Sequence, residues 1–150
     1  MKKVVPIVIL LFALTACAKD VYVDLGLPSG TLWKNQNEPG DYYTYDQAVS
    51  QFGSSLPTKE QMEELIHSCT WTWTGSGYEV AGPNGKTITM PAAGYRYCDG
   101  DVYGISTLGY YWSSTTYGTE YAWGLYFGSG DNIDIDYGTR CDGQSVRLVR

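Results

Sequence analysis

Along most of the chain beyond residue 69, apolar and polar residues alternate with a period of two, which is the pattern of strands with one buried face. Trp71 and Trp73 alternate with threonines, and Ile133 and Ile135 alternate with aspartates. Asn84-Gly85 is a strong hairpin signal, because both residues tolerate the positive φ of a tight turn. The pattern predicts strands over residues 71–73, 78–80, 87–90, 109–114, 121–127, 131–136 and 143–150.

The N-terminal part combines a hairpin with two helices. Residues 22–27 and 31–33 flank Pro28-Ser29-Gly30 and read as a hairpin. Two capping boxes follow, in each of which a threonine precedes a glutamine by three residues. They predict a short helix over residues 44–52 and a clearer one that starts at Thr58.

The first sixteen residues have the layout of a secretory signal. Lys2 and Lys3 precede an apolar run over residues 4–11, which is too short for the roughly 20 residues of a membrane span. The run ends in Leu14-Thr15-Ala16-Cys17, which resembles a bacterial lipobox. In such signals the cysteine is lipidated and becomes the new N-terminus.

These features divide the chain into three parts. We expect a lipoprotein signal at residues 1–16, the lipidated Cys17 with a short tether at residues 17–20, and one domain over residues 21–150. The expected location is the bacterial cell envelope, with the lipid anchor in the outer membrane and the domain exposed at the cell surface in one version of this prediction.

The charge balance excludes nucleic acid as a partner. The chain has 16 acidic and 10 basic residues and a net charge of −6. Removing residues 1–16 takes away two lysines and no acid, so the charge becomes −8. Nucleic acid requires clusters of Lys and Arg, which this composition does not favour.

The cysteines allow one disulfide at most in the mature part. With Cys17 assigned to lipid, Cys69, Cys98 and Cys141 are left, and three is an odd number. We favour Cys98–Cys141, because both lie in loops rich in Gly and Asp. Cys69 follows the second helix and is expected to be buried.

The region between Thr115 and Asp142 has the composition of a binding surface. Tyrosine offers a large contact area at low entropic cost, and small polar residues adapt around it. Solvated loops share this composition, so that alternative stays open. The aromatic candidates are Tyr117, Tyr121, Trp123, Tyr126 and Tyr137. The candidate face consists of Tyr117, Thr119, Glu120, Asp131, Asn132, Asp134, Asp136, Tyr137 and Asp142.

Several segments together resemble the Fibrobacter succinogenes major paralogous (FISUMP) domain. They are residues 22–33, 56–60, 69–73, 91–96, 111–114 and 143–147, in family order. The short linker between Trp33 and Asp41 departs from the family. The resemblance implies an α+β domain with a C-type lectin-like fold, in which two helices pack on small twisted antiparallel sheets. It also implies a secreted or lipid-anchored protein of Bacteroidetes-type bacteria.

The sequence gives little support for a metal site or for catalysis. The motifs of calcium-dependent sugar lectins are missing, and alternation places Asp134 and Asp136 on one face and Asp131 on the other. We therefore expect no cofactor, with calcium as the alternative. The single histidine, His67, has no Ser or Asp partner that spacing identifies, so we expect no enzyme.

The sequence thus predicts a lipid-anchored envelope protein that binds a protein or glycan partner through its C-terminal face. One alternative is a structural surface subunit with no specific ligand. Another is a target protein of a diversity-generating retroelement, whose variable residues would be the nine of the candidate face. Under this second alternative, those nine side chains lie on one solvent-facing patch.

Overall fold

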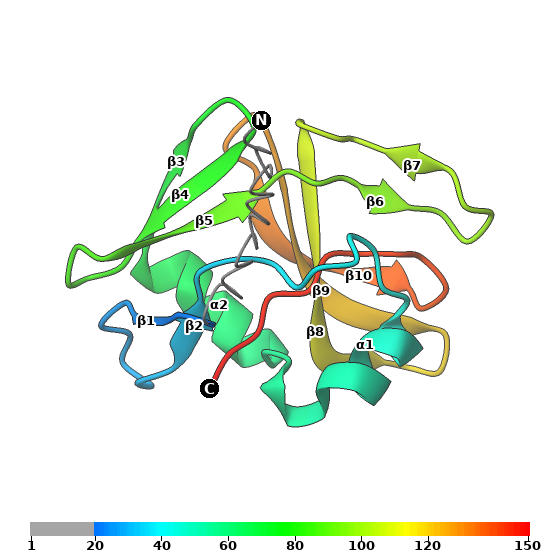
Figure 1. Ribbon diagram of the computed structural model, residues 1–150, viewed down its shortest axis with the longest axis horizontal. Coiled ribbons are helices and arrows are strands. Elements are labelled where there is room, and N and C mark those ends of the chain that lie inside the picture. Colours follow the sequence, from blue (N-terminus) through cyan, green and yellow to red (C-terminus); the bar gives the residue numbers. More distant parts are fainter. Residues whose placement is uncertain (1–19) are drawn as a thin grey trace, which may run out of the picture.

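The computed structural model describes residues 20–150 and consists mainly of short antiparallel strands (Figure 1). This part of the chain forms ten strands in four sheets and two α-helices. The helices are α1 (Tyr45–Phe52) and α2 (Lys59–Ser68), and a 3₁₀ turn, η1, covers Gly53–Ser55. The strands are β1 (Tyr22–Asp24), β2 (Leu32–Lys34), β3 (Thr70–Trp73), β4 (Gly77–Ala81), β5 (Thr87–Pro91), β6 (Tyr95–Arg96), β7 (Val102–Tyr103), β8 (Leu108–Tyr117), β9 (Tyr121–Gly128) and β10 (Ile133–Thr139).

Two three-stranded sheets enclose the larger hydrophobic core together with α2. One has the order β3-β4-β5 and the other the order β10-β9-β8. Tyr78 of β4 and Phe127 of β9 meet across this core with their ring centroids 5.1 Å apart. Helix α2 adds Met62 and Leu65, both buried, to the same cluster.

A smaller core lies on the other side of the β10-β9-β8 sheet, beneath α1. Trp112 of β8 is fully buried there, and its Nε1 donates a hydrogen bond to the Tyr43 carbonyl at 2.7 Å. Tyr45 packs edge-on against the indole, at 5.6 Å between centroids. Val146 and Leu148 from the end of the chain complete this cluster.

Residues 143–149 form a buried connection that we call the C-terminal strap. In Figure 1 this red segment crosses the middle of the molecule. It touches segments from the whole domain, since Gly143 pairs with Arg96, Gln144 with Tyr43, and Val149 with Trp33. The strand predicted for residues 143–150 is therefore replaced by isolated bridges, because its backbone groups bond to several different partners in turn.

Both capping boxes predicted from the sequence are present. The Thr44 Oγ1 accepts from the Gln47 amide, and the Gln47 side chain accepts from the Thr44 amide. Thr58 and Gln61 repeat the arrangement at the start of α2. Each box satisfies two backbone donors that have no partner inside the helix, which fixes where each helix begins.

The predicted fold class is wrong. An α+β domain of the C-type lectin-like type, with two helices packed on small sheets, is not the observed layout, which is a small β-rich fold. The helices have 8 and 10 residues and bury only Tyr45, Ala48, Met62 and Leu65 between them. Strands and the C-terminal strap supply most of both cores.

The strand pattern of the sequence also predicts that Trp71, Trp112 and Leu125 are buried, and the structure tests each of the three. Trp112 and Leu125 are buried, as the strand pattern indicated. Trp71 is only half-buried and packs against the larger core from its margin. Cys69, which we expected to be buried, is likewise of intermediate exposure and is a free thiol.

Within residues 20–150, no helix is both long enough and apolar enough to cross a membrane.

Candidate ligand-binding site

Five tyrosines gather on one side of the molecule and form a surface that we call the tyrosine face. Tyr110 of β8 is paired directly with Tyr126 of β9, and their rings stack at 6.0 Å with an interplanar angle of 27°. Tyr95 lies against Tyr110 at 4.6 Å between centroids. Tyr97 contacts both Tyr95 and Tyr103, at 5.1 and 5.0 Å.

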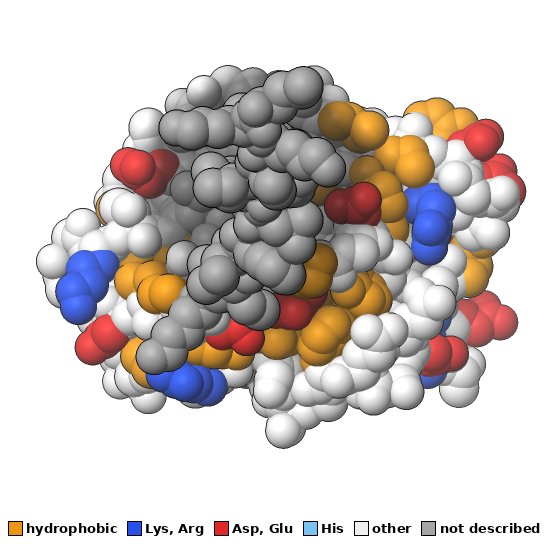
Figure 2. All heavy atoms as spheres, in the orientation of Figure 1, with side chains coloured by type: hydrophobic (Ala, Val, Ile, Leu, Met, Phe, Trp, Pro, Cys, Tyr) orange, Lys and Arg blue, Asp and Glu red, His pale blue; other side chains and the backbone are white. Residues whose placement is uncertain are grey.

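The β6–β7 ribbon carries three of these tyrosines. Tyr95 and Tyr103 face each other in its register, and Tyr97 follows β6 directly. Tyr97 and Tyr103 are 44% and 47% exposed, which is high for such large rings. Figure 2 shows hydrophobic side chains gathered over this ribbon, at the upper right, with acidic side chains at its tip.

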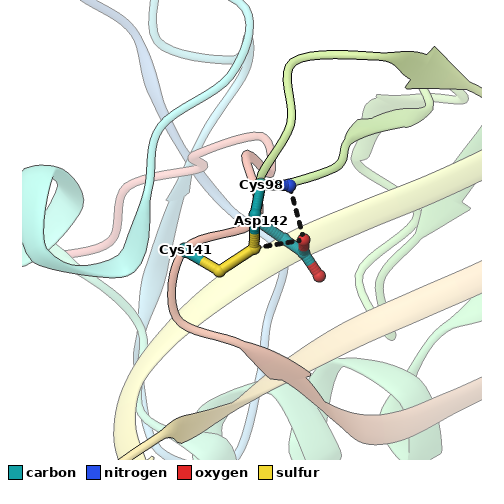
Figure 3. A group of neighbouring side chains, drawn as sticks. All are labelled: Cys98, Cys141 and Asp142. Atoms are coloured by element: carbon teal, nitrogen blue, oxygen red, sulfur yellow. Dashed lines mark hydrogen bonds between the residues drawn. A yellow bond between two sulfur atoms is a disulfide. The ribbon is translucent and has the colours of Figure 1, made fainter.

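A disulfide fixes the ribbon to the end of β10. Cys98 and Cys141 are bonded, as the sequence suggested, with their Cα atoms 5.1 Å apart (Figure 3). The Cys98 amide donates to Asp142 Oδ1 at 3.1 Å, and the same oxygen lies 3.2 Å from the Cys98 sulfur. The bond closes a separation of 43 residues, so it restrains the unfolded chain as well as the ribbon.

These three side chains do not make a metal site. Among residues 20–150 they are the only group of three potential metal ligands that converge. Metal ions bind the thiolate of cysteine, and both sulfurs here are held in the disulfide instead.

A small pocket opens at the margin of the tyrosine face. Its volume is ≈ 30 Å³, and its lining includes Tyr110, Tyr126, Asp136 and Gln144. One water needs roughly 10–15 Å³ by such a measure, so the pocket accommodates one or two waters or a group of similar size. Gln144 belongs to the C-terminal strap and is only 4% exposed.

Two tyrosines of this face, Tyr95 and Tyr110, have a pKa above the ordinary value for tyrosine. Burial raises the pKa of Tyr110, and the nearby Tyr126 and Asp136 raise it further. The pKa of Tyr95 is also raised, first by its interaction with Tyr97 and then by burial. Neutral hydroxyls both donate and accept hydrogen bonds, while Asp136 and Asp142 add acceptors to the rim.

A second aromatic group lies on the opposite face of the β10-β9-β8 sheet, and we call it the aromatic end. It consists of Tyr117, Tyr121, Trp123 and Tyr137. The Tyr117 and Tyr137 rings are 4.6 Å apart, and Lys59 of α2 lies 4.4 Å above the Trp123 ring. The carbon stem and charge of Lys59 thus cover one ring of the group.

The nine residues of the predicted candidate face do not form one patch. Tyr137 is paired with Trp123 on the side of the aromatic end, and Asp134 is paired with Tyr126 on the side of the tyrosine face. Asp131 lies at the other end of the sheet, where its amide donates to the Tyr78 hydroxyl at 3.1 Å. The remaining members are Thr119 and Glu120 in the β8–β9 turn, Asn132 before β10, Asp136 beside the small pocket and Asp142 beside the disulfide.

The nine residues are divided between two faces of the sheet because successive side chains in a strand point to opposite sides. The retroelement alternative required one solvent-facing patch, so the structure removes its support. The aspartates also do not converge on a calcium ion. Instead, Asp134 and Asp136 each accept a hydrogen bond from the next residue's amide, at 2.8 Å.

His67 lies in a shallow depression between α2 and β10, with a volume of ≈ 310 Å³. The lining also includes Lys59, Glu63 and Trp123, but no serine, threonine or cysteine that the imidazole could activate.

The tyrosine face was only partly visible in the sequence. Tyr95, Tyr97 and Tyr103 fall between the strands predicted over residues 87–90 and 109–114, and Gln144 was assigned to the strand predicted over residues 143–150. The Tyr-x-Tyr spacing of Tyr95 and Tyr97 was the one available signal, since it is the period of a strand.

A comparison with protein families gives one match. The model described as Domain of unknown function (DUF8237) matches residues 58–149. The matched region runs from the N-cap of α2 to the C-terminal strap and includes the whole tyrosine face. No curated protein and no solved structure matches the chain.

Proposed function

The chain belongs to the DUF8237 family, and because that description names no activity, we propose a function from the geometry of the site. The protein is a binding module of the bacterial cell envelope that holds a neutral carbohydrate on its tyrosine face. The tyrosine cluster beside a small pocket whose lining includes Gln144 and Asp136 carries this proposal.

The chemistry of the tyrosine face suits a sugar. A pyranose ring presents an apolar C–H face and a rim of hydroxyls, and a tyrosine presents an apolar ring with a polar tip. Asp136, Asp142 and Gln144 add acceptors and an amide at the edge of the rings. The carboxylates disfavour acidic polymers, because they would repel uronic acids and sulfates.

A protein partner is less well supported on this face. Protein interfaces are enriched in Tyr, Trp, Met and Arg and are centred on apolar pockets that an anchor side chain fills. The pocket here admits only a group of one or two waters in size and has Gln144 and Asp136 in its lining. A pocket of this size has no room for the side chain of a protein anchor.

The envelope location rests on the lipobox around Cys17, which lies outside the residues that the structure describes. A lipid anchor would hold the domain at the membrane while its binding face stays in water. The resemblance to the FISUMP domain, with its secreted and lipid-anchored members, agrees with this part of the proposal.

A glycan array probed with the full chain in detergent tests the function. We expect binding to neutral glycans, and we expect Tyr103→Ala to weaken it at least about tenfold, as loss of a contact aromatic does. Tyr117→Ala is the matched control, since Tyr117 is 45% exposed against 47% for Tyr103 but lies on the opposite face. Equal binding by both variants, or no binding to any neutral glycan, would refute the proposal.

A further inference from the structure

The side-chain amide of Gln144 has no hydrogen-bond partner among residues 20–150, although the residue is only 4% exposed. Its backbone is fully used, because the amide donates to the Tyr43 carbonyl and the carbonyl accepts from the Tyr43 amide. Among the described residues, Trp33 Nε1 is the only fully buried side-chain polar atom without a partner, so the Gln144 amide still reaches water, and it does so through the pocket that it lines. The amide is therefore free to bond with whatever enters that pocket.

Two glycines hold this amide in place at the pocket. An added Cβ on Gly138 would lie 2.5 Å from Gln144 Nε2, and one on Gly124 would lie 3.3 Å from Gln144 Oε1. Side chains at either position would therefore press on the amide, and their absence gives it room beside β9 and β10. Both glycines also line the pocket.

We infer that the Gln144 pocket is a specificity subsite that receives the exocyclic hydroxymethyl group of a bound hexopyranose. This inference rests on the proposed function, because it places the sugar ring on the adjacent tyrosines. It adds the class of sugar, namely hexoses in preference to the pentoses that lack this group.

The size and polarity of the pocket support this assignment. A volume of ≈ 30 Å³ holds one or two waters, and a CH₂OH group has two non-hydrogen atoms. Its hydroxyl can accept from Gln144 Nε2 and donate to Gln144 Oε1 or to the Asp136 carboxylate. The flanking Tyr110 and Tyr126 rings offer an apolar wall to the methylene carbon.

Other small occupants fit less well. Asp136 in the lining repels a phosphate or carboxylate group. A cation would meet one carboxylate and one amide oxygen, which is fewer than the six to eight oxygens that calcium takes. A water molecule alone would also satisfy the Gln144 amide. The experiment must therefore distinguish a pocket that holds only water from one that receives the hydroxymethyl group of a sugar.

The test is an NMR titration of the full chain in detergent micelles with matched pairs of methyl glycosides. The pairs are D-glucoside with D-xyloside, D-mannoside with D-lyxoside, and D-galactoside with L-arabinopyranoside, which differ only in the hydroxymethyl group. We expect the hexose of at least one pair to shift the Gln144 side-chain amide signals. It should also bind about tenfold more tightly than its pentose partner, which is the effect of one hydrogen-bonded polar group.

Two variants make the test independent of folding. Gln144→Met keeps the length of the side chain but removes the amide, and Gly138→Ala pushes the amide into the pocket. Both should abolish the preference for the hexose and leave the affinity for the pentose within about threefold of the wild type. The unfolding midpoint of each variant checks that the fold is retained.

The outcomes distinguish the inference from the proposed function. If hexose and pentose shift the tyrosine-face signals equally and the Gln144 amide signals stay fixed, the pocket holds only water and the inference fails while the function stands. If no glycoside shifts the tyrosine-face signals, both fail.

Discussion

At the scale of single residues, Arg147 is the group at which distant segments meet. It is fully buried, and its guanidinium donates to Asn37 Oδ1 at 2.6 and 2.9 Å, to the Lys34 carbonyl at 3.0 Å and to the Thr89 carbonyl at 2.7 Å. Burial lowers the pKa of Arg147 to about 10, because water no longer stabilises the charge. The arginine thus joins β2, the following loop and β5 to the C-terminal strap.

Replacing Arg147 should destabilise the protein strongly. Arg147→Met leaves Asn37 Oδ1 and the Lys34 and Thr89 carbonyls without their donor, which should cost on the order of 3–5 kcal/mol. Arg147→Lys should recover little of this, since an ammonium cannot reproduce the planar fork. Urea unfolding measures both variants, and a lysine variant within about 1 kcal/mol of the wild type would contradict this role.

At the scale of elements, the outer strand β10 closes its own exposed edge. The Asn132 carbonyl accepts from Gly128, and the Arg140 amide donates to Glu120, so the even-numbered residues make the bonds to β9. The odd-numbered amides therefore face outward. Asp134 and Asp136 each bind one of them, the amides of Ile135 and Tyr137, at 2.8 Å. An edge strand with open donors would invite pairing with another chain.

Removing both carboxylates should make the protein self-associate. Asp134→Ala with Asp136→Ala frees two amides and removes two charges from the edge, so we expect dimers or larger species in sedimentation velocity. Asp99→Ala with Asp101→Ala is the control, because it makes the same change in charge on the β6–β7 turn. A double edge variant that stays monomeric at the concentrations where the wild type does would disprove the capping role.

The elements that local chemistry determines could be predicted from the sequence. Thr44 and Thr58 marked the starts of α1 and α2, and Asn84-Gly85 marked the β4–β5 hairpin. The C-terminal strap could not be predicted, because its backbone bonds are made to partners far away in the chain. The β6–β7 ribbon was missed because each of its strands has only 2 residues, which is too short for an alternating pattern to show. The tyrosine face depends on both, so neither Gln144 nor Tyr103 carried a local signal of its role.

At the scale of the whole molecule, burial ties the fold to the protonation of its tyrosines. In the described part of the chain, seven tyrosines have a raised pKa, and burial raises that of Tyr111 to about 12. The others are Tyr42, Tyr43, Tyr45, Tyr78, Tyr95 and Tyr110. A group that holds its proton more tightly when folded stabilises the fold until the pH passes its folded pKa.

The protein should therefore unfold in alkali. These tyrosines contribute fully to the free energy of unfolding below pH 10, which is the ordinary pKa of tyrosine. Their contribution is lost as the pH rises toward about 12. Arg147 has the opposite effect on stability over this pH range, because its pKa is lowered in the folded protein. It is, however, one group against seven tyrosines. Tyrosinate absorbance and circular dichroism should change together. Ionisation of all tyrosines near pH 10, with the fold intact, would contradict the prediction.

The membrane anchor expected at Cys17 can be tested by the partition of the whole protein between detergent and water. If Cys17 is acylated, the wild-type protein should partition into the detergent phase and incorporate labelled palmitate, because its two or three chains hold it stably. Cys17→Ser should release the protein or leave its signal uncleaved. Cys69→Ser is the control, since it removes a thiol from within the domain. A wild-type protein that stays entirely in the aqueous phase would refute the anchor.

The C-terminal strap also determines how late in synthesis the protein can complete its fold. Ribosomes extend a chain at roughly 5–20 residues per second, from the N-terminus onward. Trp33, Tyr43 and Arg96 are synthesised well before their partners Val149, Gln144 and Gly143. Trp112 likewise waits for Val146 and Leu148 to close its core. The nascent chain thus cannot complete either core until residues 146–149 have been synthesised, so both cores close only after every helix and strand of the domain has been made.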